Sequence, residues 1–205
     1  IYRNEEGVGS ALRKNEVKRV DMFITTKLWR DDMGSESTKA AFEESLAKLE
    51  LDYIDLYLIH WPNGGKEKRM ESWKALEEIY KSGKARAIGV SNYTIKHLEE
   101  LLEYAEVKPA VNQVEFHPFL YQKDLKDFCE SHGIAIEAYS PLAHGEKLND
   151  TRFSMLARKY EKSNAQVMLR WNIQLGNIVI PKSVTPARID ENIDIFDFEI
   201  DEEDM

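Results

Sequence analysis

The alternation of short apolar runs with amphipathic segments constrains the fold more than any other feature of this sequence. Each run is rich in β-branched or aromatic residues, and several are apolar on both faces, as buried parallel strands are. The six runs span residues 22–29, 53–61, 85–92, 109–116, 134–142 and 177–184. Because strands alternate with helix patterns and no second composition class intervenes, we predict one α/β domain over residues 1–205.

Apolar residues at helical spacing fill the segments between these runs. Phe42, Leu46 and Leu49 form one stripe, behind serines that are suited to capping the helix start. A last helix is predicted behind Thr185 as cap and Pro186 at the first helical position. Left-handed helix ends are predicted at three glycines that follow helix patterns, Gly83, Gly133 and Gly176.

Two architectures fit this alternation, an open doubly wound sheet and an eight-stranded barrel. The phosphate-binding fingerprint G-x-G-x-x-G of the open sheet is missing after the early strands. Polar and reactive residues instead lie toward the carboxyl ends of all six apolar runs, and barrels have their active sites at the carboxyl ends of strands. A complete barrel has about 250 residues. We therefore predict a (β/α)8 TIM barrel whose first two strands precede residue 1 and whose C-terminal tail follows residue 205.

The polar strand ends allow structural and functional readings. Lys27 is equally compatible with a side chain that reaches solvent and with a desolvated ammonium that acts on a neighbour. His60 is followed by Trp61 and Pro62, which places it at the mouth and favours a donor to a substrate oxygen over a core histidine. Trp29 and Trp61 fit either the core or the wall of an apolar substrate pocket.

The most specific segment is "IPKSVTPARIDEN", residues 180–192. It places Lys182, Ser183 and Arg188 around a helix start, where backbone donors and cations together predict an anion site for a pyrophosphate or a 2′-phosphate. A second group combines carboxamides with an aromatic ring and suits a flat heterocycle that carries an amide, such as nicotinamide. Its members are Asn92, Gln113 and Tyr139.

Composition excludes several other classes of function. The formal net charge is -9, and the basic residues are scattered, which argues against a nucleic-acid partner. No apolar run approaches the roughly 18 residues of a membrane helix. The single Cys129 suits a reducing compartment, and we expect a cytoplasmic protein in which this thiol is buried. Four histidines lack metal-binding spacing, so we expect structural or surface roles and no metal for His97, His117, His132 and His144.

Segments along the whole chain resemble one known family. They are "YRNEEGVGSAL", "FITTKLW", "DYIDLYLIHWP", "ARAIGVSN", "PAVNQVEFHP", "EAYSPL" and "IPKSVTPARIDEN". In this order they resemble the aldo-keto reductases, in particular the small microbial and protozoan branch with 2,5-diketogluconate reductases and prostaglandin F synthase-type enzymes. The resemblance implies a (β/α)8 barrel that reduces aldehydes and ketones with NADPH. We expect a monomer that binds a small-molecule carbonyl substrate.

The resemblance also implies roles for individual residues. Tyr2, Lys27 and His60 match the catalytic Tyr, Lys and His, and the family's catalytic Asp is expected about five residues before Tyr2. Ser91, Asn92 and Gln113 match residues that hold the carboxamide, and Tyr139 matches the ring that stacks on nicotinamide. The remaining cofactor contacts implied are Ser140, Leu142, Lys182, Ser183, Val184, Arg188 and Asn192.

The implied mechanism makes physical sense. A carbonyl oxygen must gain a proton when hydride reaches its carbon. A free phenol is a weak acid with a pKa near 10, so a Lys27 ammonium would help Tyr2 by stabilising the phenolate, while His60 would orient the oxygen. Arg3 departs from the small residue that usually follows the Tyr. The alternative is a non-catalytic barrel that binds nicotinamide cofactor as a sensor, subunit or structural protein.

Overall fold

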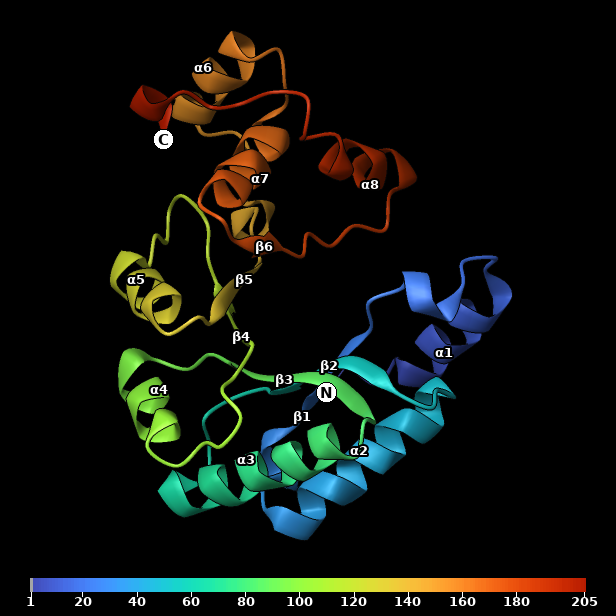
Figure 1. The fold of residues 1–205 in the computed structure, drawn as a ribbon. Coiled ribbons are helices and arrows are strands. Elements are labelled where there is room, and N and C mark those ends of the chain that lie inside the picture. Colours follow the sequence, from blue (N-terminus) through green and yellow to red (C-terminus); the bar gives the residue numbers. More distant parts are fainter. Residues whose placement is uncertain (1) are drawn as a thin grey trace. The chain divides into compact units, whose positions relative to one another are not determined.

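The computed structural model describes residues 2–205 and divides into two compact units, one that ends at Asn112 and one that begins at Gln113. Strands β1–β3 and helices α1–α4 belong to the first unit, and β5, β6 and α5–α8 belong to the second (Figure 1). Strand β4, Val111–Glu115, runs across the boundary. The single domain expected over residues 1–205 stays a prediction.

The first unit is built on three parallel strands. Strand β1, Thr25–Leu28, pairs with β2, Ile54–Ile59, with Lys27 opposite Leu58. Strand β2 also pairs with β3, Ala85–Ser91, with Ile59 opposite Val90. Because the strands are parallel and in this register, their carboxyl ends lie at the same edge of the sheet.

Helices cover one face of this sheet (Figure 1). They are α2, Ser35–Leu49, and α3, Gly65–Lys81, while α1, Glu5–Lys14, packs on α2 and α4, Ile95–Leu102, packs on α3. Strand β2 is buried along its whole length. The rings of Phe42 on α2 and Tyr57 on β2 pack edge to face, with their centres 4.8 Å apart. Each fully buried apolar side chain of this size contributes roughly 1.5–3 kcal/mol. Two short 3-10 turns, Arg19–Asp21 and Arg30–Asp32, complete the unit.

Two contacts fix the start of α1 and with it the position of Tyr2. Gly9 lies so close to the end of α2 that a Cβ atom there would stand 2.6 Å from the carbonyl oxygen of Leu49. The hydroxyl of Thr26 donates to Glu5 Oε1 at 2.7 Å, which ties α1 to β1. The residues before α1 are thereby held beside the strand that carries Lys27.

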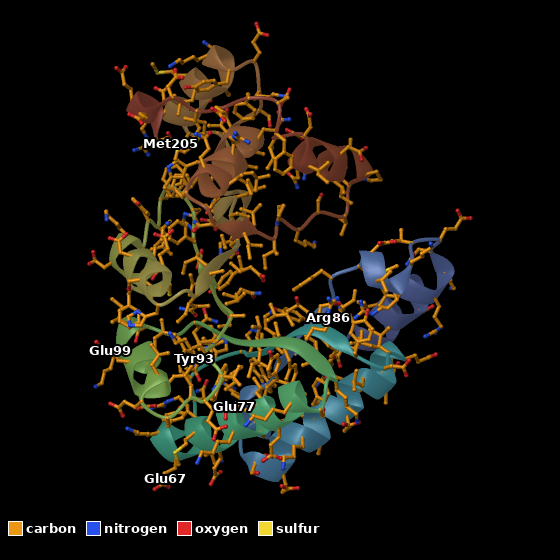
Figure 2. The ribbon with its side chains drawn as sticks, viewed as in Figure 1. Glu67, Glu77, Arg86, Tyr93, Glu99 and Met205 are labelled. Atoms are coloured by element: carbon orange, nitrogen blue, oxygen red, sulfur yellow. The ribbon has the colours of Figure 1, made fainter. Side chains whose placement is uncertain are left out.

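Buried carboxylates tie loops to this sheet and its helices. Asp55 on β2 is 1% exposed, accepts the N–H of Ile24 at 2.9 Å, and pairs with Arg19 at 2.7 Å and Arg86 at 3.1 Å. Figure 2 labels Arg86, together with Glu77 on α3. Burial raises the pKa of Asp55, but these donors outweigh burial and hold it below its usual range. Glu77 on α3 accepts the backbone N–H groups of residues 106 and 107 in the same way.

The second unit holds a shorter pair of parallel strands. Strand β5, Ala135–Tyr139, pairs with β6, Ile178–Val179, with Glu137 opposite Ile178. Its helices are α5, Lys123–Ser131; α6, Thr151–Lys159; α7, Asn164–Gln174; and α8, Pro186–Ile193. Two 3-10 turns span Ala143–Gly145 and Glu202–Asp204. The loop that follows β5 and the segment that follows β6 therefore start from the same edge of this sheet.

Most sequence predictions of local structure are confirmed. All six predicted strands form with shorter bounds, and α8 begins at Pro186 behind Thr185. Cys129 is buried, and the three predicted left-handed glycines have φ angles of 80°, 72° and 78°. The serine cap expected for α2 is wrong. Gly34 is the cap residue, with a φ of 135° that favours glycine, and its N–H donates to Ser72.

Candidate active site

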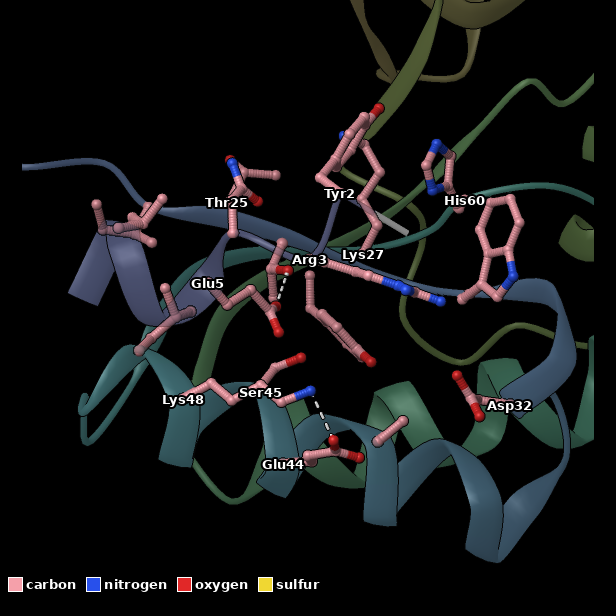
Figure 3. Close-up of a pocket in the computed structure, with 18 residues that line it drawn as sticks. Tyr2, Arg3, Glu5, Thr25, Lys27, Asp32, Glu44, Ser45, Lys48 and His60 are labelled. Atoms are coloured by element: carbon pink, nitrogen blue, oxygen red, sulfur yellow. Dashed lines mark hydrogen bonds and ion pairs between the residues drawn. The ribbon is translucent and has the colours of Figure 1, made fainter. Parts of the chain in front are cut away.

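Three of the predicted catalytic residues meet in one pocket of the first unit. The Nζ atom of Lys27 lies 5.8 Å from the centre of the Tyr2 ring, and the rings of Tyr2 and His60 are 6.0 Å apart. All three side chains project to one side of β1 (Figure 3). They line a pocket of about 370 Å³. A phenol, an ammonium and an imidazole thus face a common space, as proton transfer to a bound oxygen requires.

His60 is buried among close contacts and is uncharged at neutral pH. It follows directly on β2, its backbone N–H donates to Leu28 at 3.1 Å, and the residue is 9% exposed. The ring of Trp29 packs against it edge-on at 5.2 Å. Burial, and then the charge of Lys27, lower the pKa of His60 to about 4. A neutral imidazole in this place can donate one N–H without adding charge.

One residue of the pocket lining departs from the resemblance. Arg3 lines the pocket and has a φ of 51°, in the left-handed region that favours glycine. This backbone conformation gives a physical reason for a glycine beside the Tyr. Trp29 lines the same pocket, whereas Trp61 is 42% exposed and lies outside the described set of lining residues.

Two predicted cofactor residues adjoin His60 in the same unit. Ser91 ends β3 and is 1% exposed, and Asn92 follows with a φ of 61°. The Asn92 side chain donates to the carbonyl oxygen of His60 at 3.0 Å and contacts Ser91 Oγ at 3.1 Å. One amide therefore joins the end of β2 to the end of β3.

The second unit has a pocket that suits an anion. Lys182 and Arg188 both line it, and neither is paired with a carboxylate among the residues that the structure describes. The acidic residues Glu146 and Glu191 also line the pocket. The other predicted cofactor residues brought together here are Ser140, Leu142, Ser183 and Asn192.

Three predicted cofactor residues of the second unit lie outside this pocket. Gln113 is 4% exposed, and its side-chain amide donates to the buried carboxylate of Glu137. Tyr139 ends β5 and is half-buried. Val184 is 80% exposed. The roles assigned to these three residues stay predictions.

A model of the aldo/keto reductase family matches residues 1–205. The chain belongs to this family. Glyoxal reductase of Bacillus subtilis is 57% identical over 205 residues, which are 100% of this chain and 74% of that protein. The 9,11-endoperoxide prostaglandin H2 reductase of Trypanosoma cruzi is 50% identical over 208 residues, 100% of this chain and 73% of that protein.

Solved structures of aldo/keto reductases share the fold. The aldo-keto reductase of Bombyx mori in complex with NADP is 38% identical, with a TM-score of 0.92 over 99% of this chain and 73% of that one. This similarity confirms the predicted architecture, because the parallel strands and covering helices are those of a (β/α)8 aldo/keto reductase barrel. The family resemblance seen in the sequence is confirmed with it.

Sequence reasoning missed one polar cluster in the second unit. Glu115 contacts both His117 and His144, two histidines that we had assigned to structural or surface positions. No spacing rule connects Glu115 with a residue 29 positions away. No group of three or more His, Cys, Asp or Glu side chains in the described part of the chain is arranged to hold a metal ion. Among residues 2–205, no helix has both the length and the apolarity needed to cross a bilayer.

Proposed function

We propose that this aldo/keto reductase family member reduces aldehydes and ketones to alcohols with NADPH. One observation carries the proposal. Tyr2, Lys27 and an uncharged His60 line a single pocket, with the Lys27 ammonium 5.8 Å and the His60 ring 6.0 Å from the centre of the Tyr2 ring. These are the acid, the cation and the neutral donor that protonation of a carbonyl oxygen needs.

Each of the three groups has a separate task. Tyr2 gives its phenolic proton to the carbonyl oxygen as charge develops there. The ammonium of Lys27 stabilises the phenolate that remains. The neutral imidazole of His60 donates its N–H to the same oxygen and fixes its direction, and because it bears no charge it does not compete with Tyr2 as the acid.

The phosphate-binding residues fit NADPH. When bound, this cofactor supplies the hydride. Lys182 and Arg188 are free of carboxylate partners among the described residues and suit the phosphates, with Ser183 as a further hydrogen-bonding group. The family resemblance assigns Ser91, Asn92 and Gln113 each to the carboxamide and Tyr139 to the nicotinamide ring, and these roles stay proposals. A cytoplasmic location and a monomeric state also stay part of the proposal.

Small dicarbonyls are the proposed substrate class. The relative of 57% identity is named glyoxal reductase. The Trp29 ring packs beside His60 and gives the space that the catalytic groups face an apolar wall. Glyoxal is therefore the first substrate to test, with an aromatic aldehyde as the comparison that the tryptophan wall suggests.

The test is Tyr2→Phe, assayed by NADPH consumption with glyoxal and by NADPH binding in the absence of substrate. General-acid catalysis contributes about 10²–10⁴-fold, so we expect turnover to fall by at least about 100-fold while NADPH affinity stays within twofold. The matched control is Tyr80→Phe, which removes a 39% exposed hydroxyl on α3 and should leave both values unchanged.

Each outcome separates the alternatives. Unchanged turnover in Tyr2→Phe would rule out Tyr2 as the acid. NADPH binding by the wild type without turnover of any aldehyde would favour the non-catalytic cofactor-binding barrel. Absence of NADPH binding by the wild type would overturn the cofactor assignment itself.

A further inference from the structure

One carboxylate oxygen in the second unit serves two histidines. Glu115 ends β4, and its Oε1 atom lies 3.1 Å from Nε2 of His144 and 3.3 Å from Nε2 of His117. The side chain of His117 is 8% exposed and that of His144 is 61% exposed. Glu115 therefore links a buried imidazole to an accessible one on a distant loop.

The loop that carries His144 has an unusual backbone. Ser140, Ala143 and His144 have φ angles of 46°, 49° and 56°. Each non-glycine residue in the left-handed region is disfavoured, so such a conformation persists only when surrounding contacts hold it. Besides its contact with Glu115, His144 places Nδ1 3.4 Å from Ser140 Oγ. The imidazole thus bridges the end of β4 and the first residue of the loop.

The chain continues from this loop to α6, which begins at Thr151, and contacts of a different kind hold that end. The ring of Phe119 packs against Phe153 at 5.4 Å. The Arg152 guanidinium lies 5.3 Å from the centre of the Phe119 ring, and Lys147 Nζ lies 5.9 Å from it. These aromatic and cation–π contacts do not depend on pH near neutrality. Of these two sets of contacts, only the one made by His144 includes a group that can gain a proton near neutral pH.

His144 also lines the pocket that contains Lys182 and Arg188. Imidazole is the side chain that changes charge between about pH 5 and 8. The charged groups that face His144 are the carboxylates of Glu115, Glu146 and Glu191 and the two cations of the pocket. His117 competes for Glu115 through the same oxygen.

We propose that His144, oriented by Glu115, is a pH-dependent positioning residue for the phosphate-binding pocket. In its protonated form it pairs with Glu115, holds the loop from Ser140 to Gly145, and adds a positive charge to the pocket. Binding of a phosphorylated dinucleotide then strengthens as the pH falls. The proposal rests on the proposed use of NADPH.

The test measures NADPH dissociation constants at pH 6.0 and pH 8.0 by quenching of tryptophan fluorescence. His144→Gln keeps a hydrogen-bond donor but cannot take up charge. A phosphate monoester also titrates near pH 6, so the readout is the ratio of the dissociation constants of variant and wild type at each pH. We expect His144→Gln to bind about fivefold more weakly than wild type at pH 6.0, as for one accessible charge, and equally at pH 8.0.

Two further variants complete the design. Glu115→Gln should reduce the same pH effect, because the imidazole loses its partner. His132→Gln is the matched control, since His132 belongs to the same unit but stacks on Phe128 at 4.3 Å, and it should keep the wild-type pH dependence. An equal ratio at both pH values for His144→Gln, with NADPH still bound, would overturn this inference alone. Failure of the wild type to bind NADPH at either pH would overturn the proposed function.

Discussion

The two pockets differ in how their walls are held. In the first unit, His60 is 9% exposed and follows a strand that is buried along its whole length. In the second unit, Lys182 and Arg188 are exposed, and the adjoining loop contains three non-glycine residues in the left-handed region. Proton transfer depends on short distances, which a rigid strand end can fix. Anion binding places a weaker demand on distance, because long lysine and arginine side chains can adjust to the bound ligand.

The largest expected effect concerns the rigid pocket. The pKa of His60 is about 4 in the folded chain against an ordinary value of 6.5. The unfolded state therefore binds the proton first, so stability is full above about pH 6.5 and falls as the pH drops toward 4. The loss amounts to roughly 3 kcal/mol at pH 4. Urea unfolding from pH 7 to pH 4 should show this loss in wild type and a smaller loss in His60→Gln.

His60→Gln also alters packing beside Trp29 and so changes stability at every pH. The quantity to compare is therefore how steeply the free energy of unfolding falls with pH in each protein. Equal slopes for the two proteins would show that His60 is not held uncharged by its surroundings. The contrast between a rigid and an adaptable pocket would then lose its main support in the first unit.

A smaller effect is expected in the exposed pocket. Combining Lys182→Ala with Arg188→Ala should raise the NADPH dissociation constant about tenfold, or about 1.4 kcal/mol, because each cation is accessible to solvent. NADH lacks the 2′-phosphate, and its affinity should change by less than about threefold. Isothermal titration with both cofactors measures this difference.

Arg158→Ala on α6 is the control for a change in overall charge, and it should leave both affinities unchanged. A similar loss for NADPH and NADH would mean that the two cations do not distinguish the cofactors. The preference for NADPH would then need another explanation.

The smallest effect concerns Arg3 at the catalytic mouth. Its φ of 51° is disfavoured for arginine, so Arg3→Gly should stabilise the chain by roughly 0.5–1 kcal/mol. Arg3→Ala removes the charge but keeps a residue with a Cβ atom at this positive φ. Thermal unfolding should therefore show no increase in its stability. If both variants gain equally, side-chain charge rather than backbone conformation is the cause.

The sequence predicted what depends on local pattern. Periodicity located β2 and the Phe42 stripe of α2, and strand ends located Lys27 and His60. The cap of α2 was mispredicted because the choice of Gly34 depends on a hydrogen bond with Ser72, 38 residues away. The Glu115–His144 contact was missed for the same reason. Contacts between distant segments depend on tertiary packing, and the pattern of neighbouring residues in the sequence does not reveal them.

The hydrogen bond from Asn92 to the carbonyl oxygen of His60 has a consequence for how substrate range can change. The residue proposed to hold the carboxamide also supports the strand end that presents the imidazole. A substitution at Asn92 would therefore disturb the hydride donor and the oxygen-binding group together. New substrates are accommodated more easily through residues that contact neither Asn92 nor the carbonyl group of His60, because such changes leave the reacting groups in register.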